Sequence, residues 1–202
     1  MGMTCTLRRA SDPDIRRLLA NPGQASLFLH GPLPPMRPAR IPGVLGFLLR
    51  FLPIEVSEAD PSFPPDSSPP PDVLDLEGSW HGLHFLFTGT AWDGELPASF
   101  LVKGGTELED TDDNDELVVR ALDPGQVRAI DEFLQSLSGL ALEQGYDARR
   151  MAQLKIEPGA LRATDNPQEQ PGLAQLLEAF EGLRAYVRDT CERGQGIVIQ
   201  VS

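Results

Sequence analysis

The stretch "GSWHGLHFLFTG" (residues 78–89) holds two of the three histidines and one of the two tryptophans of this 202-residue chain. Apolar side chains recur at helical spacing from residue 73 to residue 88, with Asp75 near the start and Gly89 after the end. This pattern predicts a helix over 73–88 that other elements cover on most sides. Its expected buried face consists of Val73, Leu76, Trp80, Leu83 and Phe87.

The polar atoms on this helix allow two interpretations. His84 and Thr88 are four residues apart, and Trp80 lies one turn before His84, so the three side chains share a helix face. An aromatic ring, an imidazole and a hydroxyl can together line a pocket, which makes Trp80, His84 and Thr88 a candidate site for a small molecule or a reaction. Alternatively, His84 is a half-buried residue at the edge of the core that bonds to a backbone carbonyl. The environment of His84 decides between these interpretations.

The N-terminal residues predict a strand followed by helices. Met3, Cys5 and Leu7 alternate with polar residues, as in a strand with one buried face. The segment "SDPDIRRLLAN" (11–21) contains a capping serine or aspartate followed by proline, a combination typical of a helix start. A second short helix is expected within residues 22–30.

Prolines mark an insertion after these elements. Five lie within residues 31–42 and six within residues 61–71, on either side of an apolar helical segment at 43–52. Such proline clusters favour extended, solvent-exposed chain. We therefore expect residues 1–202 to form a single domain, with residues 31–72 as a proline-rich insertion within it.

The rest of the chain completes an α+β pattern with more helix than strand. The expected elements are a strand over 117–122, a helix opened by Asp123, Pro124 and Gln126, short helices over 139–144 and 147–153, a long helix after Asn166, Pro167 and Glu169, and a strand over 196–201. Because the strands lie at both ends and near the middle, they must pair at long range. The fold class is therefore α+β, with one small sheet that includes strands from both termini and is packed by several helices.

The charge of the chain limits its partners. The chain has a formal net charge of -13, and its sequence shows no basic stripe. We therefore expect neither nucleic acid nor an anionic membrane as a partner. A basic protein would be attracted by the negative charge of the chain. An acidic run over 107–116 is the candidate partner-binding segment. It resembles the start of a calcium-binding loop, but Asp115 and Ala121 replace the required glycine and glutamate. Its acidic residues are Glu107, Glu109, Asp110, Asp112, Asp113, Asp115 and Glu116.

No known catalytic or cofactor motif is present. The sequence lacks a Gly-x-Ser-x-Gly elbow, a phosphate-binding loop and a His-Glu-x-x-His motif, so we predict no cofactor and assign no catalytic residue. His81 and His84 have no further spaced ligands, and no metal site is predicted. Cys5 and Cys191 could form a bridge if the terminal strands are neighbours, but a reduced pair is the simpler interpretation, and it favours a cytoplasmic location. No apolar run reaches the roughly 20 residues that span a bilayer.

Several ordered blocks resemble the YfbM-like family of bacterial proteins. They are W-x-x-L-H-x-L-x-T-G at 80–89, the glycine pair at 104–105, "LDPGQVRAIDEFLQSLS" at 122–138 and "GYDARRMAQLKIEP" at 145–158. The resemblance covers residues 1–30 and 74–202 and implies a cytoplasmic bacterial α+β domain. The family is a domain of unknown function, so the resemblance assigns no catalytic residue. We therefore expect a non-enzymatic interaction module for a protein partner, and the alternative is the small-molecule or catalytic site at Trp80, His84 and Thr88.

Overall fold

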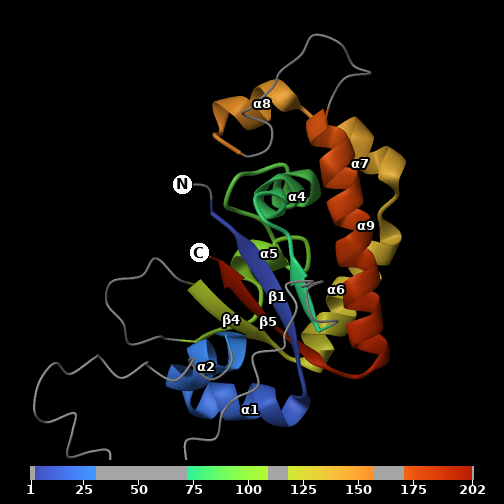
Figure 1. The fold of residues 1–202 in the computed structure, drawn as a ribbon. Helices are drawn as coiled ribbons and strands as arrows, with labels where there is room; N and C mark the ends of the chain where they lie inside the picture. Colours follow the sequence, from blue (N-terminus) through green and yellow to red (C-terminus); the bar gives the residue numbers. More distant parts are fainter. Residues whose placement is uncertain (1–2, 31–71, 109–117, 157–170, 202) are drawn as a thin grey trace, which may run out of the picture.

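A computed structural model describes residues 3–30, 72–108, 118–156 and 171–201 (Figure 1). These residues contain a five-stranded antiparallel sheet with the strand order β2-β1-β5-β4-β3. The strands are β1 (Cys5–Ala10), β2 (Val73–Asp75), β3 (Thr106–Leu108), β4 (Val118–Leu122) and β5 (Gly196–Val201).

The two strands nearest the chain ends lie side by side in the sheet. Cys5 pairs with Val201 and Leu7 pairs with Ile199, so β1 and β5 are joined along their whole length. β5 also pairs with β4 on its other side. This arrangement confirms the prediction of an α+β fold whose sheet includes strands from both termini.

Helices cover both faces of the sheet (Figure 1). They are α1 (Asp12–Ala20), α2 (Ala25–His30), α4 (Ser79–Thr88), α5 (Phe100–Lys103), α6 (Pro124–Ser136), α7 (Gly139–Gly145), α8 (Ala148–Gln153) and α9 (Pro171–Glu192), with a short 3₁₀ turn η1 (Pro22–Gln24) between α1 and α2. Cys5, Leu7 and Ile199 point to the larger core, which contains residues of α4, α6 and α9. Ala10 and Val198 point to a smaller core under α1. The alternation of strand side chains thus divides the core in two.

Predicted caps hold two of the helices in place. The Ser11 hydroxyl accepts the amide proton of Asp14 at the start of α1. At the start of α6 the Asp123 carboxylate accepts from the Gln126 amide, and the Gln126 side chain accepts from the Asp123 amide. This reciprocal capping box satisfies amide groups that the first helical turn leaves without partners, and it confirms the predicted start of α6.

The predicted helix over 73–88 is wrong in its first part. Residues Val73–Asp75 form β2 and pair with β1, with Leu74 opposite Leu7. A turn follows in which Glu77 has φ 45°, and its amide donates to the Asp75 carboxylate at 2.8 Å. The helix α4 begins only at Ser79. A residue with positive φ cannot continue a right-handed helix, so the turn separates the strand from the helix despite the helical spacing of the apolar residues.

Other predictions fall outside the described residues. The apolar segment 43–52, the capping residues Asn166, Pro167 and Glu169, and residues 109–116 of the acidic run all lie there. The single domain with an insertion over 31–72 therefore stays a prediction. Glu107, the first residue of the acidic run, lies on the short edge strand β3, which sequence reasoning did not predict.

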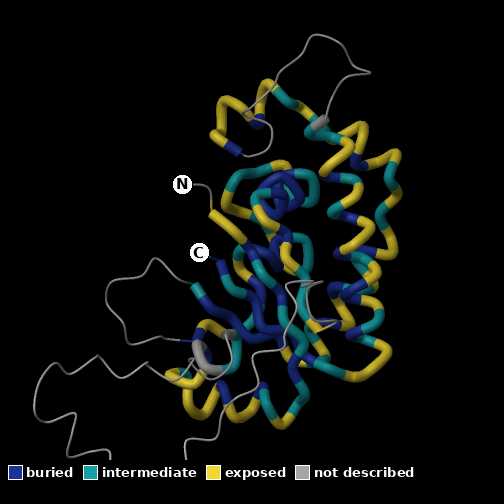
Figure 2. The backbone as a smooth tube through the Cα atoms, viewed as in Figure 1, coloured by how far each residue is buried: buried dark blue, intermediate teal, exposed yellow. Residues whose placement is uncertain are grey.

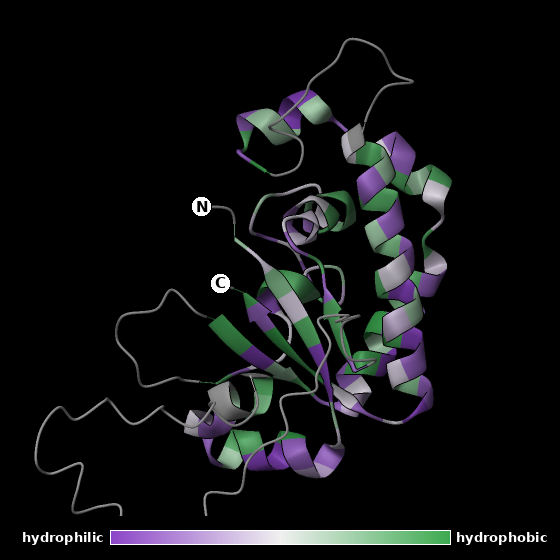
Figure 3. Ribbon diagram, in the orientation of Figure 1, coloured by the Kyte–Doolittle hydropathy of each residue, from purple (hydrophilic) through white to green (hydrophobic). Residues whose placement is uncertain are grey.

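Burial is greatest around α4 and the middle of the sheet. Figure 2 shows most of α4 in the colour of buried residues, whereas α7 and α8 are largely exposed. Figure 3 shows hydrophobic and hydrophilic residues alternating around α9, as expected for a helix with one face on the core. Among the described residues, no helix combines the length and apolar character needed to cross a membrane.

Candidate functional site

Helix α4 is the centre of the larger core. The Trp80 ring is 1% exposed, and Leu83 is fully buried beside it. The indole nitrogen of Trp80 donates to the backbone oxygen of Met3 at 3.1 Å, which ties the helix to the chain just before β1. Burial of nearly the whole N-terminal half of α4 confirms that other elements cover this helix on most sides.

His84 is enclosed in the interior. Its side chain has no exposed surface, and burial lowers its pKa to about 4, with the neighbouring His81 imidazole acting in the same direction. Its Nε2 lies 3.5 Å from the Thr88 hydroxyl oxygen, while that hydroxyl donates to the His84 backbone oxygen at 2.8 Å. Its Nδ1 has no hydrogen-bond partner among the described residues. The imidazole is therefore neutral near pH 7 and closed off from solvent.

The structure brings Trp80, His84 and Thr88 together on α4 as predicted, but in the interior of the protein. Trp80 and His84 are buried, and Thr88 is partly exposed. A ligand would have to enter the core to contact all three side chains. This burial favours packing and internal hydrogen bonding over a pocket that is open to solvent.

His81 lies between two tryptophan rings. Its ring stacks on Trp80 with centroids 5.0 Å apart and planes 18° apart, and it contacts Trp92 with centroids 4.4 Å apart. Its Nε2 donates to the Ala91 backbone oxygen at 3.0 Å, because a carbonyl can only accept. His81 therefore links α4 to the loop that follows it.

Trp92 is the residue of this cluster that faces solvent. It lies on the loop 89–97 between α4 and α5, and half of its surface is exposed. Its ring centroid is 5.9 Å from that of Trp80, and it packs against His81 as well, so part of the indole is covered and the remainder is free. The sequence analysis gave Trp92 no role. Its position after a helix-ending glycine was the only available signal.

A network of hydrogen bonds fixes the loop beneath Trp92. The Thr88 hydroxyl accepts from the Thr90 amide at 3.2 Å, and the Thr90 hydroxyl accepts from the Asp93 amide at 3.1 Å and donates to the Asp93 backbone oxygen. The Asp93 carboxylate accepts from the Gly94 amide at 2.9 Å and forms an ion pair with Lys103 of α5. These two bonds hold the pKa of Asp93 below its usual value.

Gly94 lets the loop close onto α4. Its φ is +141°, and an added Cβ would lie 2.7 Å from Cγ2 of Thr88 and 3.2 Å from Cβ of Ser99. Only glycine fits this approach without a shift of its neighbours. The loop is thus a tightly packed structure that holds Trp92 in one place.

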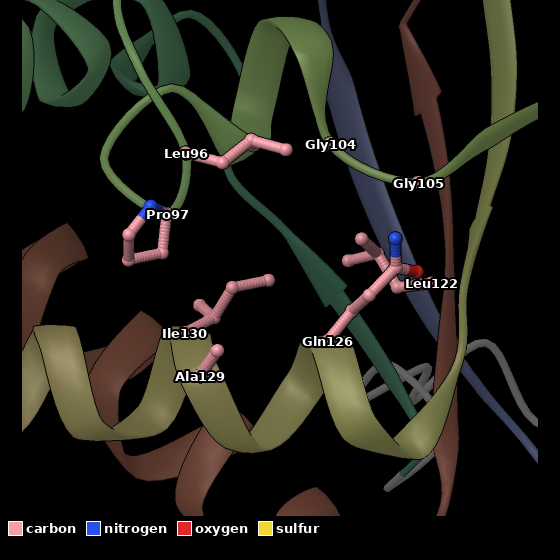
Figure 4. Close-up of a pocket in the computed structure, with 8 residues that line it drawn as sticks. All are labelled: Leu96, Pro97, Gly104, Gly105, Leu122, Gln126, Ala129 and Ile130. Carbon is pink, nitrogen blue, oxygen red and sulfur yellow. The ribbon is translucent and has the colours of Figure 1, made fainter.

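An apolar pocket of about 260 Å³ opens where the same loop meets α6 (Figure 4). Leu96 stands at its edge with 58% of its surface exposed. The residues that line it are Leu96, Pro97, Gly104, Gly105, Leu122, Gln126, Ala129 and Ile130. The loop therefore carries two exposed apolar side chains, Trp92 and Leu96.

Of the acidic residues in the candidate partner-binding segment 107–116, the structure describes only Glu107. It is exposed on the edge strand β3, where it pairs in register with Arg120 of β4. The Arg120 guanidinium is buried and donates to the backbone oxygens of Leu101 and Val102, the former at 2.6 Å, so it holds the last turn of α5. Glu109, Asp110, Asp112, Asp113, Asp115 and Glu116 lie outside the described residues.

Within the described ranges, no group of three or more histidine, cysteine, aspartate or glutamate residues is placed to bind a metal ion. Cys5 and Cys191 are free thiols. Burial raises the pKa of Cys5 to about 12, so this thiol stays protonated and a poor nucleophile near pH 7.

Comparisons with known proteins agree with this fold. A family model described as "Domain of unknown function (DUF1877)" matches residues 1–200. The chain is also similar to the crystal structure of a protein of unknown function, YfbM, from Escherichia coli, with a TM-score of 0.63 and 19% identity over 98% of this chain and 99% of that chain. At this identity the likeness shows the fold alone. Among curated proteins no match was found.

Proposed function

Because this chain belongs to the DUF1877 family of domains of unknown function, its role has to be inferred from its own residues, and we propose that it is a non-enzymatic binding module for a protein partner. The contact surface of the proposed module is centred on the loop 89–97. The observation that carries the proposal is the half-exposed Trp92 ring on a loop with fixed geometry.

An exposed tryptophan that is fixed in advance suits protein binding. Tryptophan is enriched among the residues that contribute most to interfaces, because its large ring excludes water from a wide contact. Contacts with Trp80 and His81 already restrict the Trp92 ring, so little side-chain entropy remains to be lost on binding. Leu96 on the same loop adds a second apolar contact. The loop thus combines an anchor with a low cost of ordering.

The charge of the chain favours a basic partner. The chain has 30 acidic and 17 basic side chains, so two copies of it would repel each other. A basic protein would instead be attracted, and its association would slow as salt is added. We propose that the acidic run 107–116 contributes to this attraction, with Glu107 as its described member.

The experiment compares one anchor variant with one matched control. Immobilised full-length wild type, Trp92→Ala and Leu19→Ala are used to recover partners from cells of the native host, and each recovered protein is then purified and titrated. Leu19 is also an exposed apolar residue, but it lies on α1 over the smaller core, on the other face of the sheet. We expect the same partner with wild type and Leu19→Ala, and a loss of affinity of at least about 30-fold with Trp92→Ala, as for an anchor worth about 2 kcal/mol.

Two results would contradict the proposal. One is a purified partner that binds all three proteins with equal affinity. The other is repeated recovery at low salt that returns no stoichiometric partner. Unfolding curves of the Trp92→Ala protein, measured in parallel, distinguish loss of a contact from loss of the fold.

A second candidate is the small-molecule or catalytic site at Trp80, His84 and Thr88. The observation in its favour is that two buried polar atoms near Thr88, Nδ1 of His84 and the hydroxyl of Ser99, have no partner among the described residues. Buried polar atoms without partners are uncommon and can mark a bound water or ligand. A ligand whose affinity falls in His84→Gln but is unchanged in Trp92→Ala would support this candidate over the first.

A further inference from the structure

The surroundings of Trp92 bear on which side chain of a partner would contact it. The covered part of its indole packs on His81 and Trp80, so the exposed part is available to a flat group from outside. Asp93 and Glu95 follow within three residues, and both are exposed. An indole face next to a carboxylate attracts a cation through the ring quadrupole and the negative charge together.

Glu95 is the carboxylate of this loop that is left for a partner. Asp93 is already paired with Lys103. Among the described residues, the Glu95 side chain has no hydrogen bond or ion pair. The nearby cation Arg150 is also engaged, since it donates to the Gly89 backbone oxygen at 3.5 Å and lies over the Phe85 ring. The exposed part of Trp92 and the exposed Glu95 side chain, three residues apart on one loop, are therefore both available to a cation from outside.

We infer that the protein partner inserts an arginine side chain at this position, with its guanidinium stacked on Trp92 and paired with Glu95. This inference rests on the proposed function, since it assumes that Trp92 contacts a protein. Arginine fits better than lysine because its guanidinium is planar, weakly hydrated and able to stack on an aromatic face while its N–H groups reach a carboxylate. The acidic balance of the whole chain favours the same sign of partner.

The test uses short blocked peptides and needs no identified partner. The acetylated and amidated tripeptides Gly-Arg-Gly, Gly-Lys-Gly and Gly-citrulline-Gly are titrated into the full-length ¹⁵N-labelled protein, and the two indole N–H resonances are followed. Citrulline has nearly the same shape as arginine without its charge. The Trp80 indole N–H is bonded to Met3 in the interior and serves as the internal reference, and Trp92→Phe assigns the signals.

We expect the arginine peptide to shift the Trp92 resonance saturably while the Trp80 resonance stays in place. Its affinity should exceed that of the citrulline peptide by about two- to fivefold, the effect of one exposed cation–π contact, and should also exceed that of the lysine peptide. Glu95→Gln should narrow the gap between arginine and citrulline, and added salt should do the same.

Equal binding of the arginine and citrulline peptides, or no saturable shift of Trp92, would overturn this inference. The same would follow if Glu95→Gln left the preference for arginine unchanged. These results are separable from failure of the proposed function. If the peptides do not discriminate but Trp92→Ala still loses a purified partner, Trp92 binds a protein through another kind of side chain. If neither effect is seen, both proposals fail.

Discussion

The ring centroids of Trp80 on α4 and Trp92 on the following loop are 5.9 Å apart, yet the two rings have opposite environments. Trp80 is 1% exposed and bonds to the backbone of Met3, whereas Trp92 is 50% exposed. His81 contacts both rings and joins the two regions. Helix α4 thus supplies a rigid support for the neighbouring loop, which carries the proposed contact surface. Substitutions in the two regions should therefore affect different properties.

The largest effect is expected for Trp80→Ala. Removal of this ring takes away its contacts with the larger core and leaves a cavity, so the free energy of unfolding should fall by roughly 3–5 kcal/mol. Because a domain of this size has only about 5–15 kcal/mol of stability, the variant should be poorly folded. Urea unfolding followed by circular dichroism measures the change. A melting curve close to wild type would mean that α4 is not the support we describe.

The second effect concerns the pH dependence caused by His84. Its pKa is about 4 in the folded protein, against 6.5 for an ordinary histidine, so the unfolded chain binds a proton more readily. The stabilising contribution of the neutral ring is fully present above pH 6.5 and is lost progressively as the pH falls from about 6.5 to about 4. Between pH 7.5 and pH 4.5 this loss should lower the free energy of unfolding by about 2–3 kcal/mol.

The measurement for His84 is a comparison of urea unfolding at those two pH values in wild type and His84→Gln. Carboxylates titrate in the same range in both proteins, so the difference between them isolates the histidine. Wild type should lose more stability on acidification than the variant. Equal losses would indicate that His84 is solvated and that the interior around α4 is open.

A smaller effect is expected for Gly94→Ala, which tests the rigidity of the loop. The new Cβ would collide with Cγ2 of Thr88, and alanine is strained at φ +141°, so the free energy of unfolding should fall by about 1–3 kcal/mol. Gly182→Ala on α9 is the matched control, since its Cβ would meet nothing within 4 Å and alanine favours a helix. If both variants unfold at the same urea concentration, the loop is not packed against Thr88 as described.

The smallest effect on stability is expected for Trp92→Ala. The ring already faces solvent on one side, so its truncation opens no closed cavity and should cost no more than about 1 kcal/mol. Thermal unfolding of this variant beside Trp80→Ala gives the contrast directly. A loss as large as that of Trp80→Ala would make Trp92 a core residue and remove the basis for a binding role.

Local sequence signals predicted those parts of the fold that depend on local structure. The Asp123 and Gln126 capping box and the alternation around Cys5 and Leu7 specified a helix start and a strand, because caps and pleats require particular residues at fixed spacing. The strands β2 and β3 were missed because each has only three residues, and pairing with neighbouring strands defines them. In β2 the apolar spacing even favoured a helix.

For the candidate site, sequence reasoning found the cluster but not its exposed member. The helical spacing of Trp80, His84 and Thr88 correctly placed them on one helix, because that spacing is a local property. Whether a tryptophan faces the core or solvent depends on what packs against it from distant parts of the chain. For Trp80 this is the N-terminal segment at Met3, and no comparable element covers Trp92 within the described residues.

Acrylamide quenching of tryptophan fluorescence tests the contrast between the two rings most directly. In wild type both indoles emit, whereas in Trp92→Phe the emission comes from Trp80 alone. We predict that wild-type emission is strongly quenched by acrylamide, and that the emission of Trp92→Phe lies at shorter wavelength and is quenched far less. Equal quenching of the two proteins would contradict a sealed Trp80 beside a solvent-facing Trp92, and with it the separation of support and contact surface.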